Sequence, residues 1–109
     1  MSKKIYNKLI RDKIPEIIKQ SGGVPEISIL TEADFRKALR VKMTEEAQEL
    51  LEAKSTEDVL NELSDIEELV RAIAKNYSIS LQELEKHRKA KLRGRGGFEE
   101  KLFLGSVEE

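Results

Sequence analysis

The length of 109 residues predicts one small domain over residues 1–109 and argues against a multidomain protein. Its 20 Lys and Arg nearly balance its 21 Asp and Glu, so the net charge is close to zero. Leu, Ile, Val and Phe provide 31 residues, or 28%, above the roughly 20% typical of disordered chains, and the absence of Cys excludes disulfides and thiolate metal sites. Because 38% of the residues are charged and so small a domain leaves much of its surface wet, we expect apolar faces to close against further copies in a homodimer or homotetramer.

The first half of the chain predicts a short helix, an extended segment and a long helix. Three Ile residues follow helical spacing over residues 13–21, and Asp12 is the expected N-cap. Residues 26–30 alternate between apolar and polar side chains like a short strand. Thr31 then caps a helix that runs to about residue 53, with an apolar stripe along one face.

The second half predicts two more helices and a second extended segment. Ser55 or Thr56 caps a long helix, which the short connection folds back antiparallel on the preceding one. A capping box at Ser80 begins a last helix, which is expected to end before a loop over residues 93–97. Residues 101–104 are a candidate strand partner for the first extended segment. The predicted fold class is mainly all-α: an antiparallel helical hairpin that completes a four-helix-type bundle on oligomerisation, with one or two short extended segments.

No apolar run approaches the roughly 18 residues that a membrane-spanning helix needs. The charged start of the chain also lacks the apolar stretch and small-residue cleavage site of a signal peptide. We therefore expect a cytoplasmic protein with no membrane partner.

Charge is segregated along the chain. Residues 1–20 carry six basic and two acidic side chains, residues 45–68 one basic and ten acidic, and residues 86–101 seven basic and two acidic. Such an arrangement suits a polyphosphate bound through metal ions, because carboxylates hold the cations while Lys and Arg meet the remaining phosphate charge. The alternative is that these residues only solvate helix faces.

Glu46 lies within the apolar stripe of the helix that begins at Thr31. At 100° per residue it is about 20° from Leu39, while Glu49 and Glu45 lie beside the stripe. An ionised carboxylate on a buried face is costly unless it meets a cation. The position of Glu46 therefore predicts a cationic partner.

Two acids of the next helix extend this group. Glu62 and Asp65 lie beside its apolar stripe, where an antiparallel hairpin brings them opposite Glu46 and Glu49. Carboxylates from two helices, without His or Cys, match the ligands that Mg²⁺ prefers, with Mn²⁺ as an alternative ion. For the remaining acids of the run we prefer pairing with Lys or Arg on a solvent face: Glu52, Glu57, Asp58, Glu67 and Glu68.

Three motifs resemble a known family. Glu45-Glu46-x-x-Glu49, twelve intervening residues and Glu62-x-x-Asp65 resemble the metal-binding signature of the all-α nucleotide pyrophosphohydrolases, the MazG and phosphoribosyl-ATP pyrophosphohydrolase-like superfamily. The segment from Tyr6 to Glu16 resembles the opening of a single-domain branch, and Arg95-Gly96-Gly97-Phe98 resembles its closing loop. The resemblance spans nearly the whole chain and identifies residues 1–109 as a single MazG-like domain.

The resemblance implies Mg²⁺-dependent hydrolysis of a nucleoside or deoxynucleoside triphosphate to the monophosphate and pyrophosphate, including the removal of damaged or surplus nucleotides. It implies that Glu46, Glu49, Glu62 and Asp65 hold the metal. It also implies catalytic roles for Glu46, Glu49 and Glu45, the last as a ligand or as the base that orients water. The larger relatives carry tandem helical modules, so this single module requires a homo-oligomer to complete the core.

Six basic residues near the two ends are the candidates for phosphate binding, because Arg forks and Lys ammonium groups suit phosphate oxygens. They are Lys8, Arg11, Lys13, Lys91, Arg93 and Arg95. The alternative is that both basic segments are only solvated.

Two other functions stay open. Phosphoribosyl-ATP hydrolysis would share the chemistry and change the substrate. A noncatalytic helical oligomer would instead bind a nucleic acid backbone through the basic residues 86–95. Aromatic residues are nearly absent from that segment, which argues against base stacking, and we do not expect a nucleic acid partner.

Overall fold

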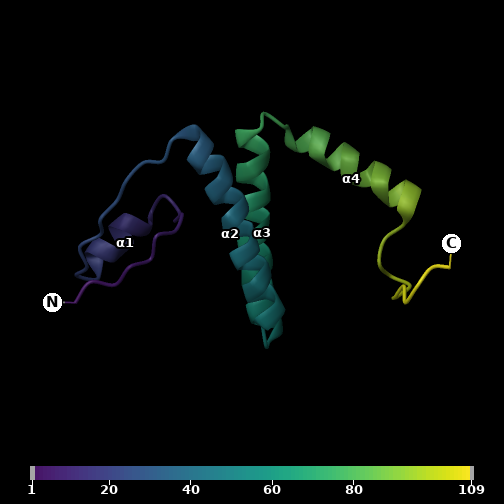
Figure 1. The fold of residues 1–109 in the computed structure, drawn as a ribbon, viewed down its shortest axis with the longest axis horizontal. Coiled ribbons are helices and arrows are strands. Elements are labelled where there is room, and N and C mark those ends of the chain that lie inside the picture. The colour runs from purple at the N-terminus through teal and green to yellow at the C-terminus, as the bar shows by residue number, and fades with distance from the viewer. Residues whose placement is uncertain (1, 109) are drawn as a thin grey trace.

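The computed structural model describes residues 2–108, which form four α-helices and no strand (Figure 1). The helices are α1 (Ile14–Gln20), α2 (Glu32–Glu52), α3 (Thr56–Asn76) and α4 (Leu81–Arg95). α2 and α3 pack along their length as an antiparallel hairpin, α4 meets only the end of α3, and α1 packs on none of the other three helices. The predicted all-α class and its helical hairpin are confirmed.

Hydroxyl side chains cap the three longer helices. The Oγ atoms of Thr31, Ser55 and Ser80 each accept a hydrogen bond from the backbone N–H three residues later, at 3.2, 3.1 and 3.0 Å. Each bond satisfies one of the N–H groups that has no partner within the first turn of a helix. These caps confirm the predicted starts of α2, α3 and α4.

Two predicted helix boundaries were wrong. The N-cap position of α1 is Lys13, without a side-chain cap, so Asp12 does not cap this helix. α4 continues through Arg93, Gly94 and Arg95, which were expected to lie in a loop. The helix ends at Gly96, whose φ of 80° is left-handed and suits glycine.

The two extended segments do not pair. Residues 26–30 precede α2 on one side of the hairpin, whereas residues 101–104 follow α4 on the other side (Figure 1). The chain extends 60 Å along its longest axis, which keeps the segments apart. The predicted strand pairing was therefore wrong within the single chain.

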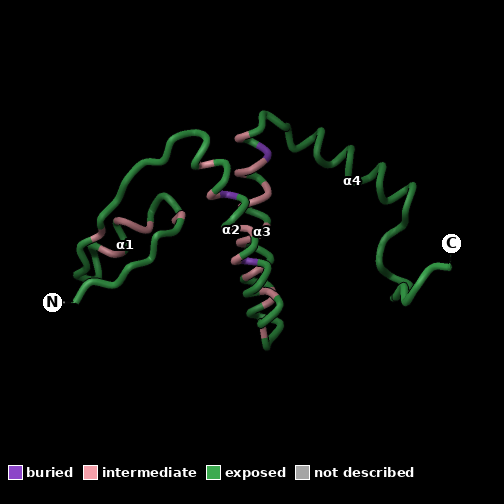
Figure 2. The backbone as a smooth tube through the Cα atoms, in the orientation of Figure 1, coloured by how far each residue is buried: buried purple, intermediate pink, exposed green. Residues whose placement is uncertain are grey.

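The core is a thin layer between α2 and α3 (Figure 2). Among residues 2–108, Leu39 and Ala74 are the only buried hydrophobic residues, at 2% and 5% exposure. The radius of gyration is 18.4 Å, whereas a compact domain of this length has about 13 Å. One chain therefore leaves most of its apolar surface uncovered.

Polar contacts hold α2 against the end of α3. The Arg36 guanidinium donates to the Asn76 side-chain oxygen at 2.8 Å and lies 4.4 Å from the centre of the Tyr77 ring. Arg40, one turn along α2, donates to the Tyr77 hydroxyl at 2.5 Å. These contacts set the register that places the middle of α2 opposite the middle of α3.

Within the described residues, no helix is long and apolar enough to cross a membrane.

Candidate metal centre

Three carboxylates gather between α2 and α3. Glu46 and Glu49 project from adjacent positions one turn apart on α2, and Glu62 projects from α3. One oxygen from each of the three lies within 4.8 Å of the others. The antiparallel hairpin thus brings together three of the four residues predicted to hold a metal, and we call these three the carboxylate cluster.

Two oxygens of the cluster are buried without a partner. Glu46 is 7% exposed, which makes it as buried as the hydrophobic core around it. Its Oε2 atom and the Oε2 atom of Glu62 are both shielded from solvent and accept no hydrogen bond. Burying a carboxylate oxygen in this way costs free energy that a bound cation would recover.

The cluster also perturbs the protonation of its members. Burial raises the pKa of Glu46 from 4.5 to about 7, together with the nearby Glu62 carboxylate and the charge of Glu49. Burial raises the pKa of Glu62 as well. Carboxylates that share a site cannot all ionise without a compensating cation, so the metal-free cluster retains a proton near neutral pH.

Lys42 is a cation that the protein itself provides at the cluster. Its Nζ atom lies 3.7 Å from Glu45 Oε2 and 3.9 Å from Glu46 Oε1, and its side chain is largely buried. On Glu46, Lys42 therefore contacts the Oε1 atom and not the buried Oε2 atom. Lys42 therefore links Glu45 to the cluster and leaves the two buried oxygens without a partner.

Asp65, the fourth predicted ligand, meets Arg11. The guanidinium Nη2 atom donates to Asp65 Oδ1 at 2.7 Å, which joins the N-terminal segment to α3. A predicted phosphate-binding residue and a predicted metal ligand are thus neighbours. No local pattern in the sequence connects these two residues, because 54 positions separate them.

The other predicted phosphate-binding residues fall into two groups. Lys8 lines a pocket beside Lys42 and Glu45, and Lys13 is exposed at the start of α1. The remaining three are exposed on α4, which runs away from the hairpin (Figure 1): Lys91, Arg93 and Arg95. Within one chain, Lys8 lies near Lys42 and Glu45, whereas the α4 group lies away from the carboxylate cluster.

The donor set suits a hard divalent cation. All the candidate ligand atoms are carboxylate oxygens, which Mg²⁺, Mn²⁺ and Ca²⁺ prefer and which zinc and copper sites usually supplement with nitrogen or sulfur. Glu49 is exposed, so the cluster is open to solvent on one side. The arrangement can hold a cation and leave coordination positions for water or an anionic ligand.

Comparisons with known proteins assign no family. No protein-family model matches the chain, and no solved structure matches it. Over 52 residues it is 40% identical to an uncharacterised protein of Mycolicibacterium smegmatis. That match covers 48% of this chain and 53% of the relative, so the aligned stretch spans about half of each protein. The chain is a small all-helical protein with an acidic triad that could hold a metal ion.

Proposed function

We propose that the chain is a divalent-cation-dependent nucleoside triphosphate pyrophosphohydrolase, a hydrolase acting on phosphorus anhydrides. It converts a nucleoside or deoxynucleoside triphosphate to the monophosphate and pyrophosphate. One observation carries the proposal: Glu46 and Glu62 present buried, unpartnered oxygens to the same cluster. The order of the acidic and terminal motifs, which resembles that of the all-α nucleotide pyrophosphohydrolases, supports the choice of substrate.

The residues present fit a metal ion. Glu46, Glu49 and Glu62 would hold Mg²⁺, or Mn²⁺ in its place, and Asp65 is the adjacent fourth carboxylate. When bound, the ion would neutralise phosphate oxygens and lower the pKa of a coordinated water. The open side of the cluster at Glu49 is where a triphosphate would enter.

Basic side chains around the cluster would orient the substrate. Lys42 and Lys8 line the adjoining pocket, and Arg11 pairs with Asp65. Lys ammonium and Arg guanidinium groups bind phosphate oxygens through charge-assisted hydrogen bonds. They would balance the charge of the triphosphate and align it with the carboxylates.

Glu45 is the base in this proposal. Its carboxylate is half-buried beside the cluster and held near Lys42. It would accept a proton from a water molecule as the water oxygen forms a bond to the α-phosphorus and the bond to the pyrophosphate oxygen breaks. Pyrophosphate leaves with the electron pair, and no side chain forms a covalent intermediate.

The proposal is tested by measuring pyrophosphate and monophosphate release from ordinary and modified nucleoside triphosphates and from phosphoribosyl-ATP, with Mg²⁺, with Mn²⁺ and without metal. Glu46→Gln and Glu49→Gln remove charge from the cluster, and Glu68→Gln is the control because Glu68 is exposed on α3. We expect metal-dependent release that falls at least about 100-fold in the two cluster variants and is unchanged in the control. The best substrate defines the role, with phosphoribosyl-ATP as the alternative.

Release that persists without metal, or in both cluster variants, would overturn the mechanism. Absence of release from every substrate by the folded protein would overturn the proposed activity. Salt-sensitive binding of nucleic acid that needs no metal would then favour the noncatalytic oligomer.

A further inference from the structure

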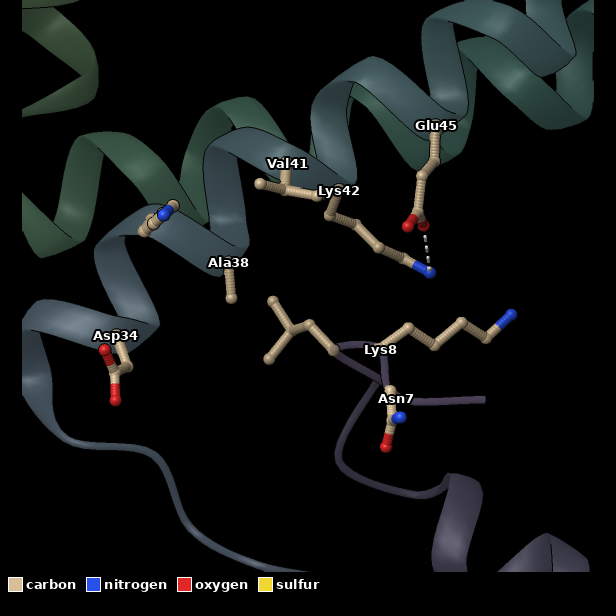
Figure 3. Close-up of a pocket in the computed structure, with 9 residues that line it drawn as sticks. Asn7, Lys8, Asp34, Ala38, Val41, Lys42 and Glu45 are labelled. Atoms are coloured by element: carbon tan, nitrogen blue, oxygen red, sulfur yellow. Dashed lines mark ion pairs between the residues drawn. The ribbon is translucent and has the colours of Figure 1, made fainter. Parts of the chain in front are cut away.

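A pocket of about 240 Å³ lies between the N-terminal segment, residues 7–9, and one face of α2 (Figure 3). This volume gives room for one heterocyclic ring system. The pocket is separate from the carboxylate cluster and adjoins it at Glu45. When the phosphates of a nucleotide are bound at the carboxylate cluster, the walls of this pocket therefore determine which other part of the nucleotide binds in it.

The middle of the pocket is apolar. Ala38 of α2 faces the N-terminal segment in Figure 3, and the pocket is also lined by Val41 of α2 and Leu9 of the N-terminal segment. Apolar walls accept the faces of a flat ring and exclude its water. A phosphate group would gain nothing from such walls.

Polar groups stand around this apolar middle. Asn7, Asp34 and Lys37 line the pocket together with its apolar residues. They supply both donors and acceptors: an amide, a carboxylate and an ammonium group. A nucleobase has apolar faces and donor and acceptor atoms at its edge, so its chemistry matches this pattern.

The pocket also has a direction. Asp34 stands near one end, and Lys42 and Glu45 stand near the other, with Lys8 extending beside them (Figure 3). The rise of 1.5 Å per residue separates Asp34 from Glu45 by about 16 Å along α2. Lys42 lies 3.9 Å from Glu46, so the Lys42 end leads into the carboxylate cluster.

We propose that this pocket is the nucleobase subsite, with the base held between Leu9 and the Ala38 and Val41 wall and the phosphates directed past Lys42 to the carboxylate cluster. The inference rests on the proposed function and adds to it the element that recognises the nucleoside. It makes the N-terminal segment part of the substrate site, because that segment forms one wall.

The test separates base binding from phosphate binding. Isothermal titration in Mg²⁺ measures the affinity of a purine and a pyrimidine nucleoside monophosphate and of inorganic pyrophosphate. Ala38→Leu fills the middle of the pocket, Lys37→Ala removes a polar group without filling it, and Ala90→Leu, on exposed α4, is the control. Steady-state kinetics on the preferred triphosphate give KM and kcat for the same proteins.

For Ala38→Leu we expect nucleoside monophosphate affinity to fall about tenfold or more and KM to rise to match, with pyrophosphate affinity unchanged. Lys37→Ala is expected to change the ratio of purine to pyrimidine affinity, again without an effect on pyrophosphate. Unchanged nucleotide affinity in Ala38→Leu, or an equal loss of pyrophosphate affinity, would overturn the subsite.

These measurements distinguish failure of the proposed subsite from failure of the proposed function. If the wild type hydrolyses nucleotides and Ala38→Leu has an unchanged KM, the activity stands and the subsite is wrong. If the wild type hydrolyses nothing but binds a nucleoside monophosphate in a way that Ala38→Leu abolishes, the subsite stands and the activity is wrong.

Discussion

Glu46 of α2 and Glu62 of α3 each direct one carboxylate oxygen into the buried space between the two helices, where neither oxygen accepts a hydrogen bond. Glu49 adds a third carboxylate within the same 4.8 Å cluster. Two acidic residues seldom face each other in the core between two helices, and this core has few apolar residues. The pair makes the metal-free hairpin less stable, and with Glu49 it could hold a metal ion.

The first prediction concerns the metal-free protein. The pKa of Glu46 is raised from 4.5 to about 7 by folding, so below pH 4.5 both states hold the proton. Between pH 4.5 and 7 the unfolded state loses it while the folded state keeps it, and the free energy of unfolding falls as pH rises. Glu46→Gln stays neutral and should escape this loss. At pH 8 without metal we expect it to be more stable than wild type by about 1 to 2 kcal/mol, after allowing for solvent screening at the open side.

Urea unfolding in EDTA at pH 4.5, 6 and 8 measures this effect. The difference between Glu46→Gln and wild type should grow from pH 4.5 to 7 and then level off. Glu68→Gln, on the exposed side of α3, should show no such growth. A Glu46→Gln protein that is less stable than wild type at pH 8 would show that the carboxylate already has a compensating partner.

The second prediction concerns metal binding. A cation must displace the proton that the cluster retains, so affinity for Mg²⁺ should fall as pH drops below about 7. At 100 times its dissociation constant, Mg²⁺ should stabilise the folded wild type by about 2.7 kcal/mol. Thermal unfolding should show a rise in Tm of roughly 10 °C at pH 8 and little at pH 5.5.

Glu46→Gln and Glu62→Gln should abolish most of this stabilisation, because each removes one of the buried oxygen ligands. The exposed control Glu68→Gln should keep it. An equal rise in Tm in all four proteins would mean that Mg²⁺ acts on the acidic surface in general and not at the cluster.

Much of this site could be predicted because its determinants are local. Thr31 and Ser55 are capping residues whose effect reaches only one turn, so the ends of α2 and α3 follow from a few positions. Helical spacing alone places Glu46 among apolar residues, and a short connection alone makes the hairpin antiparallel. These local rules bring Glu46 and Glu62 together.

The remaining features depend on contacts that no local pattern encodes. The Arg11–Asp65 pair joins positions 54 residues apart, and the pocket forms where an irregular segment lies on α2. The predicted end of α4 was wrong because the whole Arg- and Gly-rich stretch 93–97 was expected to form a loop. An exposed helix tolerates an internal glycine at a cost of about 1 kcal/mol, and the left-handed Gly96 ends it instead.

The third prediction concerns Arg11. Its ion pair with Asp65 is about half exposed, so Arg11→Gln should change stability by less than about 1 kcal/mol. The guanidinium occupies a carboxylate next to the metal centre and repels a cation. Removing it should therefore increase Mg²⁺ affinity in the absence of nucleotide, while KM for the nucleotide should rise because the proposed phosphate contact of Arg11 is lost.

These opposite effects distinguish Arg11 from a residue with only a structural role. Titration of Mg²⁺ and steady-state kinetics provide the two readouts, and Lys19→Gln, on exposed α1, is the control for a lost positive charge. Asp65→Asn should remove the effect of Arg11→Gln on Mg²⁺ affinity when the two are combined. A KM for the nucleotide that stays at the wild-type value would exclude Arg11 from phosphate binding.

The fourth prediction concerns assembly. Leu81, Leu84 and Leu92 lie within about 80° of one another on α4, and each is more than a third exposed. A lone helix with an uncovered apolar stripe has only marginal stability in water. The same holds for a chain of 109 residues whose radius of gyration is 18.4 Å, because it buries little surface. We expect a homodimer or homotetramer in which a second copy covers this stripe and completes a helical bundle.

Leu84→Glu places a charge in the stripe and should shift the assembly toward the monomer by at least tenfold in dissociation constant, measured by sedimentation equilibrium. Ala90→Glu adds the same charge on the opposite face of α4 and should leave the assembly intact. The Tm of wild type should also rise with protein concentration, since association stabilises only the folded chain. A wild type that sediments as a monomer at all concentrations, with a stable core and the radius of gyration of the single chain, would contradict this prediction. The exposed leucines would then require a different partner.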